Sequence, residues 1–175
     1  MSSANIMALG PCSGSFATND LGDLADVTIT LAKKVNDIME PSNYGDNPID
    51  AVDMGISAQA ELTVLEADMT ILSNLPGFTK VIGTTTTGTY ISFGGTAGAT
   101  AITTGALVIT PKDSAKIGYK TELHKAYLAS CEPTIVYTPE GIAQGAFTLV
   151  FRGMIDTTKN EGDMVGRFGA TGAVV

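Results

Sequence analysis

Between Ile56 and Val64 the chain alternates strictly between apolar and polar residues. The apolar members are Ile56, Ala58, Ala60, Leu62 and Val64, and the polar members are Ser57, Gln59, Glu61 and Thr63. Side chains on a β-strand point alternately to the two faces of a sheet. The pattern therefore predicts a strand whose apolar face holds the core and whose polar face lies in water.

A second strand with the same alternation is predicted from Ala25 to Leu31, with an extension toward Val35. In it, Val27, Ile29 and Leu31 share one face, and Thr28 and Thr30 share the other. Between the two strands lie Pro41, Gly45 and Pro48, which do not belong in a central strand. We therefore predict one long hairpin over residues 25–66, in which residues 33–55 form the arm and its loop.

One helical pattern follows the hairpin. It runs from Ala67 to Leu75, with apolar residues at i, i+4 and i+7, and Pro76-Gly77 ends it. Further strand candidates are Thr79–Ile82, Thr89–Phe93, Ala106–Thr110, Leu123–Ser130, Thr134–Tyr137 and Ala146–Asp156. The last has apolar residues on both faces (Phe147, Leu149, Phe151 and Ile155 on one, Val150 and Met154 on the other), so burial of both faces is predicted, inside the domain or at a subunit contact. The stretch 83–105 is rich in Gly, Thr and Ala, which is typical of a loop.

These patterns predict a single domain over residues 1–175. Its class is mainly β: a β-sandwich or partial barrel with one short flanking α-helix and a long β-hairpin arm. Turn signals over residues 1–24 predict an irregular N-terminal segment. The glycine content of residues 160–175 predicts a flexible C-terminal tail.

The charge distribution limits the partners of the chain. Charged residues are 16% of the total, below the roughly 25% of an average soluble domain. The net charge is −8; residues 1–68 hold 11 acidic and 2 basic side chains, giving −9, and the remainder carries +1. Such a chain does not attract nucleic acid through phosphate contacts, but an acidic wall would repel DNA.

The sequence also indicates in which cellular compartment the protein is found. The first ten residues contain no basic side chain, so no secretory signal peptide is predicted, and no apolar run reaches the length of a membrane helix. Cys12 and Cys131 match no metal spacing, and we expect reduced thiols. These features predict a protein made and kept in a cytoplasm, with no membrane contact.

No residue pattern predicts catalysis, a metal or a cofactor. The stretch Gly83–Thr89 resembles a phosphate loop but lacks its lysine. Asp46, Asp50 and Asp53 do not have the calcium-loop spacing and are expected to be a solvated acidic loop. His124 is the single histidine and is predicted to be an exposed or interface strand residue. A hydrolase that pairs His124 with a Ser or Asp is left as an alternative.

An ordered series of features resembles the tail tube (major tail) proteins of tailed bacteriophages. It consists of Asp20-Leu21-Gly22, a Thr/Val strand, the loop 44–50, Gly55, the alternating strand, and Glu66-Ala67-Asp68 before a short helix. The similarity covers about residues 8–75. It implies a tail-tube-like fold in which six copies form a ring, each lends strands to a continuous inner barrel, and rings stack into a tube.

The resemblance also implies the partners and the place of the protein. The chain assembles with itself in the virion tail, after synthesis in the host cytoplasm, and DNA passes through the tube without specific binding. Tail terminator, baseplate or tip, and tape-measure proteins are the further partners. The alternative class is another virion surface or decoration protein, or an adhesin-like β-module, which would not polymerise into a hollow tube.

Two sets of residues are assigned on this basis. The residues predicted to face the channel are Thr28, Thr30, Gln59, Glu61 and Thr63. The residues predicted to form a loop between subunits are Tyr44, Asp46, Pro48, Asp50 and Asp53. No catalytic, metal or cofactor residue is assigned.

Overall fold

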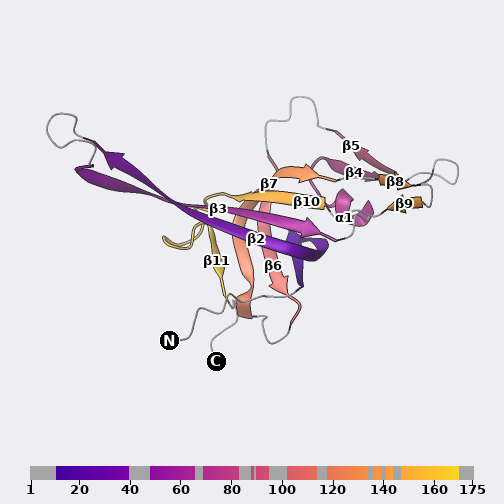
Figure 1. Cartoon of the computed structure of the whole chain (residues 1–175), viewed down its shortest axis with the longest axis horizontal. Coiled ribbons are helices and arrows are strands. Elements are labelled where there is room, and N and C mark those ends of the chain that lie inside the picture. The colour runs from indigo at the N-terminus through magenta and orange to yellow at the C-terminus, as the bar shows by residue number, and fades with distance from the viewer. Residues whose placement is uncertain are drawn as a thin grey trace.

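The computed structural model is mainly β, with a closed antiparallel barrel of six strands, one further strand beside it and one short helix (Figure 1). It describes residues 11–39, 48–65, 69–82, 88, 90–94, 102–113, 118–133, 136–138, 141–143 and 147–169. The barrel strands are β1 (Cys12–Phe16), β2 (Asn19–Ile38), β3 (Asp50–Val64), β6 (Thr104–Pro111), β7 (Thr121–Glu132) and β10 (Phe147–Gly153).

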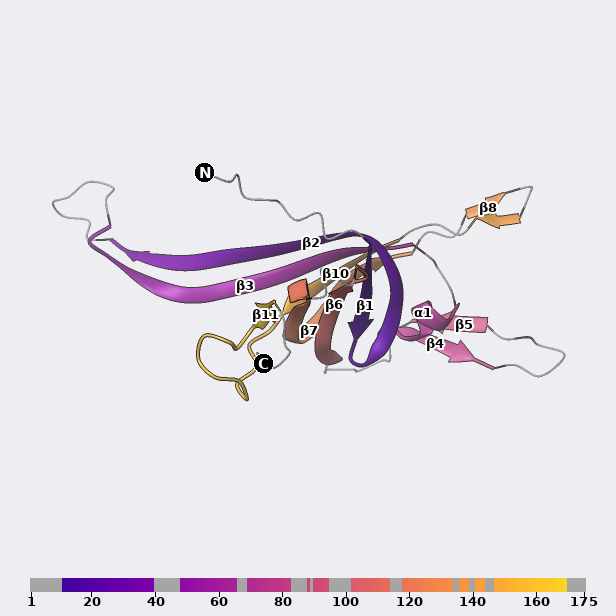
Figure 2. The same cartoon turned by 90° about the horizontal axis from the view of Figure 1, so that it is seen from below.

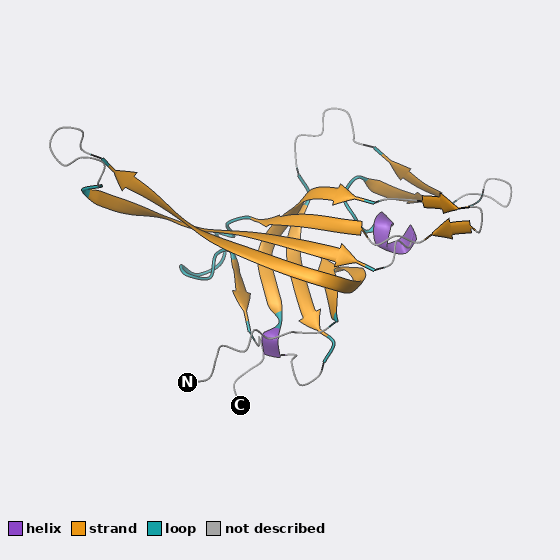
Figure 3. Cartoon of the chain, in the orientation of Figure 1, coloured by secondary structure: helices purple, strands orange, loops and turns teal. Residues whose placement is uncertain are grey.

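The remaining elements lie around the barrel. They are α1 (Met69–Ser73), the hairpin of β4 (Phe78–Val81) and β5 (Tyr90–Phe93), the hairpin of β8 (Val136–Thr138) and β9 (Gly141–Ala143), and β11 (Gly166–Phe168). Figure 3 shows that strands dominate and that the described helical structure is short. The predicted helix is thus confirmed over residues 69–73, where Leu72 and the following Leu75 are buried against the core.

The barrel closes because β10 pairs on both of its edges. The strand order is β10-β3-β2-β1-β6-β7, and β7 pairs back to β10. Leu149 of β10 lies between Leu62 of β3 and Cys131 of β7 in the two ladders. Closure satisfies the backbone donors and acceptors of the barrel within one copy. The sheet is therefore a single closed barrel rather than a sandwich or a partial barrel.

The period-two alternation fills the barrel with apolar side chains. Ala58, Ala60, Leu62 and Val64 of β3 are buried, and Phe147, Leu149 and Phe151 of β10 are buried beside them. The rings of Phe16 and Phe151 lie 4.9 Å apart, tilted by 43°. The predicted apolar face of β3 is confirmed at these positions. In β10 only the face of Phe147 is fully buried, whereas burial of both faces was expected: Val150 is half-buried. Ile155, expected to share the face of Phe147, lies beyond the end of β10 and is 61% exposed.

The N-terminal prediction is wrong for residues 12–16 and 19–24, which are strands rather than irregular chain. β1 pairs with both β2 and β6, and Phe16 and Leu21 are fully buried. Gly14 lies in the middle of β1, where a Cβ would stand only 3.0 Å from a methyl carbon of Leu24. The glycine that we interpreted as a turn signal instead allows a close packing contact inside a sheet.

Part of the predicted C-terminal tail is a strand: β11 pairs with β7 in the register Gly166 to Leu123. The flexibility of the tail stays a prediction. Residues 170–175 lie outside the described part of the chain, as do most residues of the predicted loop 83–105. Within that loop the structure describes β5 and the start of β6 as strands.

Both cysteines lie on barrel strands. Cys12 on β1 is buried and Cys131 on β7 is half-buried. Burial raises the pKa of the Cys12 thiol, and burial with the nearby Glu132 carboxylate raises the pKa of Cys131 to about 11. Because the thiolate is the reactive form, neither cysteine is set up as a nucleophile.

Candidate functional site

The most distinctive surface is a two-stranded arm that projects from the barrel. β2 and β3 continue together well beyond the closed sheet, as Figures 1 and 2 show. Every residue from 31 to 39 and from 48 to 57 is exposed. We use the name arm for residues 31–39 and 48–57. The predicted long hairpin is confirmed, and residues expected in its loop up to Ile38 and from Asp50 onward belong to the strands.

The arm carries an unusual amount of exposed apolar surface. Its exposed large hydrophobic side chains are Leu31, Val35, Ile38, Met39, Ile49, Val52, Met54 and Ile56. Leu31 (65% exposed) and Ile56 (56% exposed) were expected in the core, because they continue the alternation of the buried positions. They are exposed because the strands have left the barrel at that point. This much exposed apolar surface on one element is typical of an interaction site.

Both long edges of the arm also lack partners in the described part of the chain. β1 pairs with β2 only as far as Leu24, and β10 pairs with β3 only from Gln59 onward. Beyond these points each strand is paired with the other alone. An exposed strand edge presents unpaired backbone N–H and C=O groups to any strand that approaches.

A bulge and an ion pair set the local geometry of the arm. The register shifts between Lys33 and Val35, opposite Gly55, whose φ is +89°. Lys33 Nζ lies 2.9 Å from Asp53 Oδ2, and Gly55 N–H donates to Asp53 Oδ1 at 2.9 Å. The hydrogen bond from Lys33 is the main reason that the pKa of Asp53 is lowered. Because the pair is exposed, it fixes geometry more than it adds stability.

The residues predicted to face a channel lie together on the outer face of the barrel. Thr28 pairs with Glu61 and Thr30 pairs with Gln59, while Thr63 pairs with Asp26. All five predicted side chains are exposed or half-buried, and the residues between them on β3 are buried. Arg152 of β10, opposite Gln59, extends the same face with a positive charge. The common polar face is confirmed, and its role as a channel wall stays a prediction.

The predicted loop between subunits is only partly described. Tyr44 and Asp46 lie outside the described residues, and Pro48 is exposed. Asp50 and Asp53 are not loop residues: both lie in β3, paired with Ile38 and Val35. Asp50 and Asp53 lie in a strand because the ladder between β2 and β3 continues to Ile38, where Ile49 N–H donates to the Ile38 carbonyl at 3.0 Å.

His124 was predicted to be an exposed or interface strand residue. It lies on β7, but its side chain is completely buried within the chain. Nε2 lies 2.9 Å from Oδ1 of Asp163, and Nδ1 lies 3.3 Å from Oε1 of Glu122. Arg167 Nη2 lies 3.4 Å from the other carboxylate oxygen of Asp163. A catalytic triad needs one ring nitrogen directed at a nucleophile. Here both nitrogens face carboxylates, so the arrangement is not that of a hydrolase triad.

Sequence reasoning missed this cluster because its members lie far apart in the chain. His124 and Asp163 are separated by 39 residues and meet only because β11 pairs with β7. The one local signal was Glu122, two residues before His124 on the same strand and therefore on the same face. Among the described residues, no group of three His, Cys, Asp or Glu side chains is arranged to hold a metal ion.

The pH dependence of this cluster is predictable at Asp163. The hydrogen bond from His124 is the main cause that lowers its pKa below the ordinary 3.8, partial burial opposes it, and Arg167 adds to it. A lowered carboxylate pKa stabilises the fold above the unfolded value, and this contribution is lost as the pH falls through the folded value. Asp163→Asn is therefore expected to lower the free energy of unfolding at pH 7.

The difference between Asp163→Asn and the natural protein should shrink as the pH falls below about 3.8. Urea denaturation at pH 7, 5 and 3, followed by circular dichroism, measures it. A constant difference across this range would contradict the assignment, because the amide cannot titrate.

No family model matches the chain, and no curated protein matches it. None of the helices in the described part of the chain has the length and apolar character needed to span a bilayer.

Proposed function

We propose that this protein is a tail tube protein of a tailed bacteriophage. Copies of the chain join into hexameric rings, and the rings stack into the tube through which DNA leaves the head. The observation that carries the proposal is the arm, a two-stranded sheet with exposed apolar side chains and unpartnered edges that leaves a closed barrel. The ordered sequence resemblance over residues 8–75 supports the same class.

The arm favours assembly on physical grounds. Fully burying one aliphatic side chain of this size contributes about 1.5–3 kcal/mol, so covering most of those on the arm contributes on the order of 10 kcal/mol before the costs of association. Unpaired backbone groups on both edges add directional hydrogen bonds when another strand lies alongside. A contact of a different patch with each neighbour is heterologous, and such contacts propagate into rings and filaments.

The outer face formed by Thr28, Thr30, Gln59, Glu61 and Thr63 is proposed to line the channel. Hydroxyl, amide and carboxylate groups keep such a wall hydrated, and Asp26 on the same face adds a second negative charge to that of Glu61. Like charge prevents DNA from adhering to the wall as it passes. Arg152 is the one cation among the cross-strand partners of this set.

Electron microscopy of the purified protein in negative stain tests the proposal. We expect rings or tubes with a central hole at high protein concentration. Assemblies without a hole would favour a decoration or adhesin-like module. Compact monomers alone, both in solution and in the presence of preformed tail initiator, would contradict a tail tube function.

A further inference from the structure

The chain after β10 leaves the barrel in a loop and returns as β11 to the edge of β7. We use the name strap for residues 154–169, which include β11 and the loop before it (Figure 2). Backbone hydrogen bonds hold it to the edge of β7: Met154 N–H donates to the Lys125 carbonyl at 2.7 Å, and His124 N–H donates to the Val165 carbonyl at 3.1 Å. β11 pairs with β7 over three residues only. So short a strand is not stable by its own ladder.

The side chain of His124 joins the strap to the barrel. It is completely buried, Asp163 of the strap faces Nε2, and Glu122 of β7 faces Nδ1. Arg167 and Lys159 of the strap act on Asp163 electrostatically. β6, which pairs with β7 on its other edge, contributes no charged side chain between Thr104 and Pro111. On β10, the other strand that pairs with β7, Arg152 stands opposite Tyr127. In the described part of the chain, the two ring nitrogens of His124 therefore contact two carboxylates.

The number of protons on the ring decides how many of these contacts are hydrogen bonds. An ionised carboxylate only accepts, and a neutral imidazole has one N–H donor and one lone pair. Both contacts are hydrogen bonds when both ring nitrogens carry protons. When one proton leaves, a nitrogen lone pair faces a carboxylate oxygen, and an attraction becomes a repulsion.

We propose that His124, Glu122 and Asp163 form a proton-dependent latch that holds the strap on β7. The latch is closed when the imidazole carries both protons and both carboxylates are ionised. Loss of one imidazole proton weakens it, because one ring nitrogen then faces a carboxylate oxygen with a lone pair. Opening lifts β11 from Thr121–Leu123 of β7 and uncovers a strand edge there. The latch does not depend on whether the chain forms tubes.

Hydrogen exchange of the strap amides across pH 5.5 to 8.5 tests the latch. After correction for the intrinsic pH dependence of exchange, the opening equilibrium of the strap is expected to rise roughly tenfold, the factor set by one charge-assisted hydrogen bond. Amides of β3 should show no such rise. His124 is the single histidine, so its imidazole resonances report its titration without ambiguity.

Three variants separate the latch from general effects of charge. His124→Gln cannot titrate and should give a flat profile. Glu122→Gln replaces the carboxylate beside Nδ1 by an amide that donates to the neutral ring, and it should flatten the profile as well. Asp23→Asn removes one negative charge from an exposed ion pair with Lys112, which does not involve the latch. It should keep the pH dependence of strap exchange seen in the natural protein.

The proposal is overturned if strap exchange in the natural protein is independent of pH after correction. It is equally overturned if Glu122→Gln keeps the full pH-dependent rise. Should His124→Gln not fold, the natural protein and Glu122→Gln still decide between these outcomes. All measurements use the monomeric protein, so a failure to form tubes does not affect them.

Discussion

Phe151→Ala is expected to lower the free energy of unfolding by about 3–5 kcal/mol, a large part of the total for a domain of this size. Phe151 is fully buried, and its ring lies 4.9 Å from that of Phe16 across the barrel interior. It also stands between Ala60 of β3 and Leu128 of β7, at the strand that closes the barrel. Truncation removes aromatic contacts and leaves a cavity that the closed sheet cannot collapse to fill.

Val150→Ala is the matched control for this prediction. Val150 precedes Phe151 on β10 and points to the outer face, where it is half-buried opposite Glu61. Its truncation should cost less than about 1 kcal/mol. Urea denaturation of both variants, at a concentration where light scattering shows monomers, measures the difference. Equal losses would mean that the interior of the barrel is not the main source of stability.

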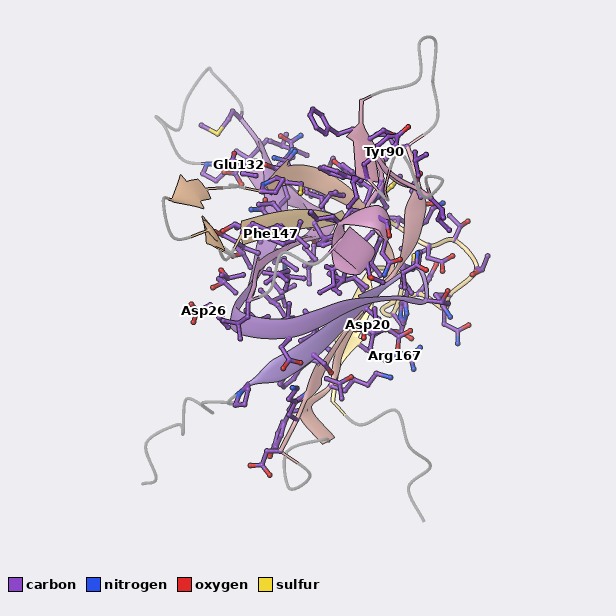
Figure 4. The ribbon with its side chains drawn as sticks, turned by 90° about the vertical axis from the view of Figure 1, so that its right-hand side faces the viewer. Asp20, Asp26, Tyr90, Glu132, Phe147 and Arg167 are labelled. Atoms are coloured by element: carbon purple, nitrogen blue, oxygen red, sulfur yellow. The ribbon has the colours of Figure 1, made fainter. Side chains whose placement is uncertain are left out.

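The sequence predicted those parts of the fold that depend on local alternation. β3 alternates without interruption from Ile56 to Val64, and its apolar face is buried as expected at Leu62. In β10 Val150 interrupts the alternation, and Phe147 is buried as expected. Figure 4 shows the molecule from the end opposite the arm, with Phe147 on β10 and Tyr90 on β5 labelled. A period of two fixes which face of a strand is buried, but it does not tell whether the sheet closes.

Short strands and distant contacts were beyond local reasoning. β1 has glycine in its middle, and β11 spans three residues, so neither has enough alternation to be recognised. Both exist because a neighbouring strand supplies their hydrogen bonds. The environment of His124 depends on β11 in the same way, and for this reason a buried histidine was expected to be exposed.

The arm shows where an alternating pattern misleads. The pattern in β3 continues without a break from Val64 back to Ile56, whereas burial ends at Ala58. The closing strand β10 pairs with β3 only from Gln59 onward, so the barrel ends there. Farther out, no described residue of the same chain covers the apolar side chains of this pattern. Under the proposed function, a second copy covers them.

Ile56→Asp is therefore expected to abolish assembly while the barrel remains folded. Ile56 is 56% exposed on the arm, where it pairs with Lys33. In a monomer the new carboxylate stays in water and costs little. In an assembly that covers the arm it must be desolvated, which costs several kcal/mol unless Lys33 compensates it fully. The concentration needed for assembly should rise by about 100-fold or more.

Ile155→Asp is the control that isolates the arm. Ile155 is the same residue type with a similar exposed fraction, 61%, but it lies after the end of β10, on the strap. It introduces the same charge and removes the same apolar surface. Sedimentation velocity and negative-stain microscopy of both variants, with circular dichroism to verify the fold, compare their assembly. If both variants assemble as the natural protein does, the arm is not the surface that joins the subunits. If neither assembles, the loss is not specific to the arm.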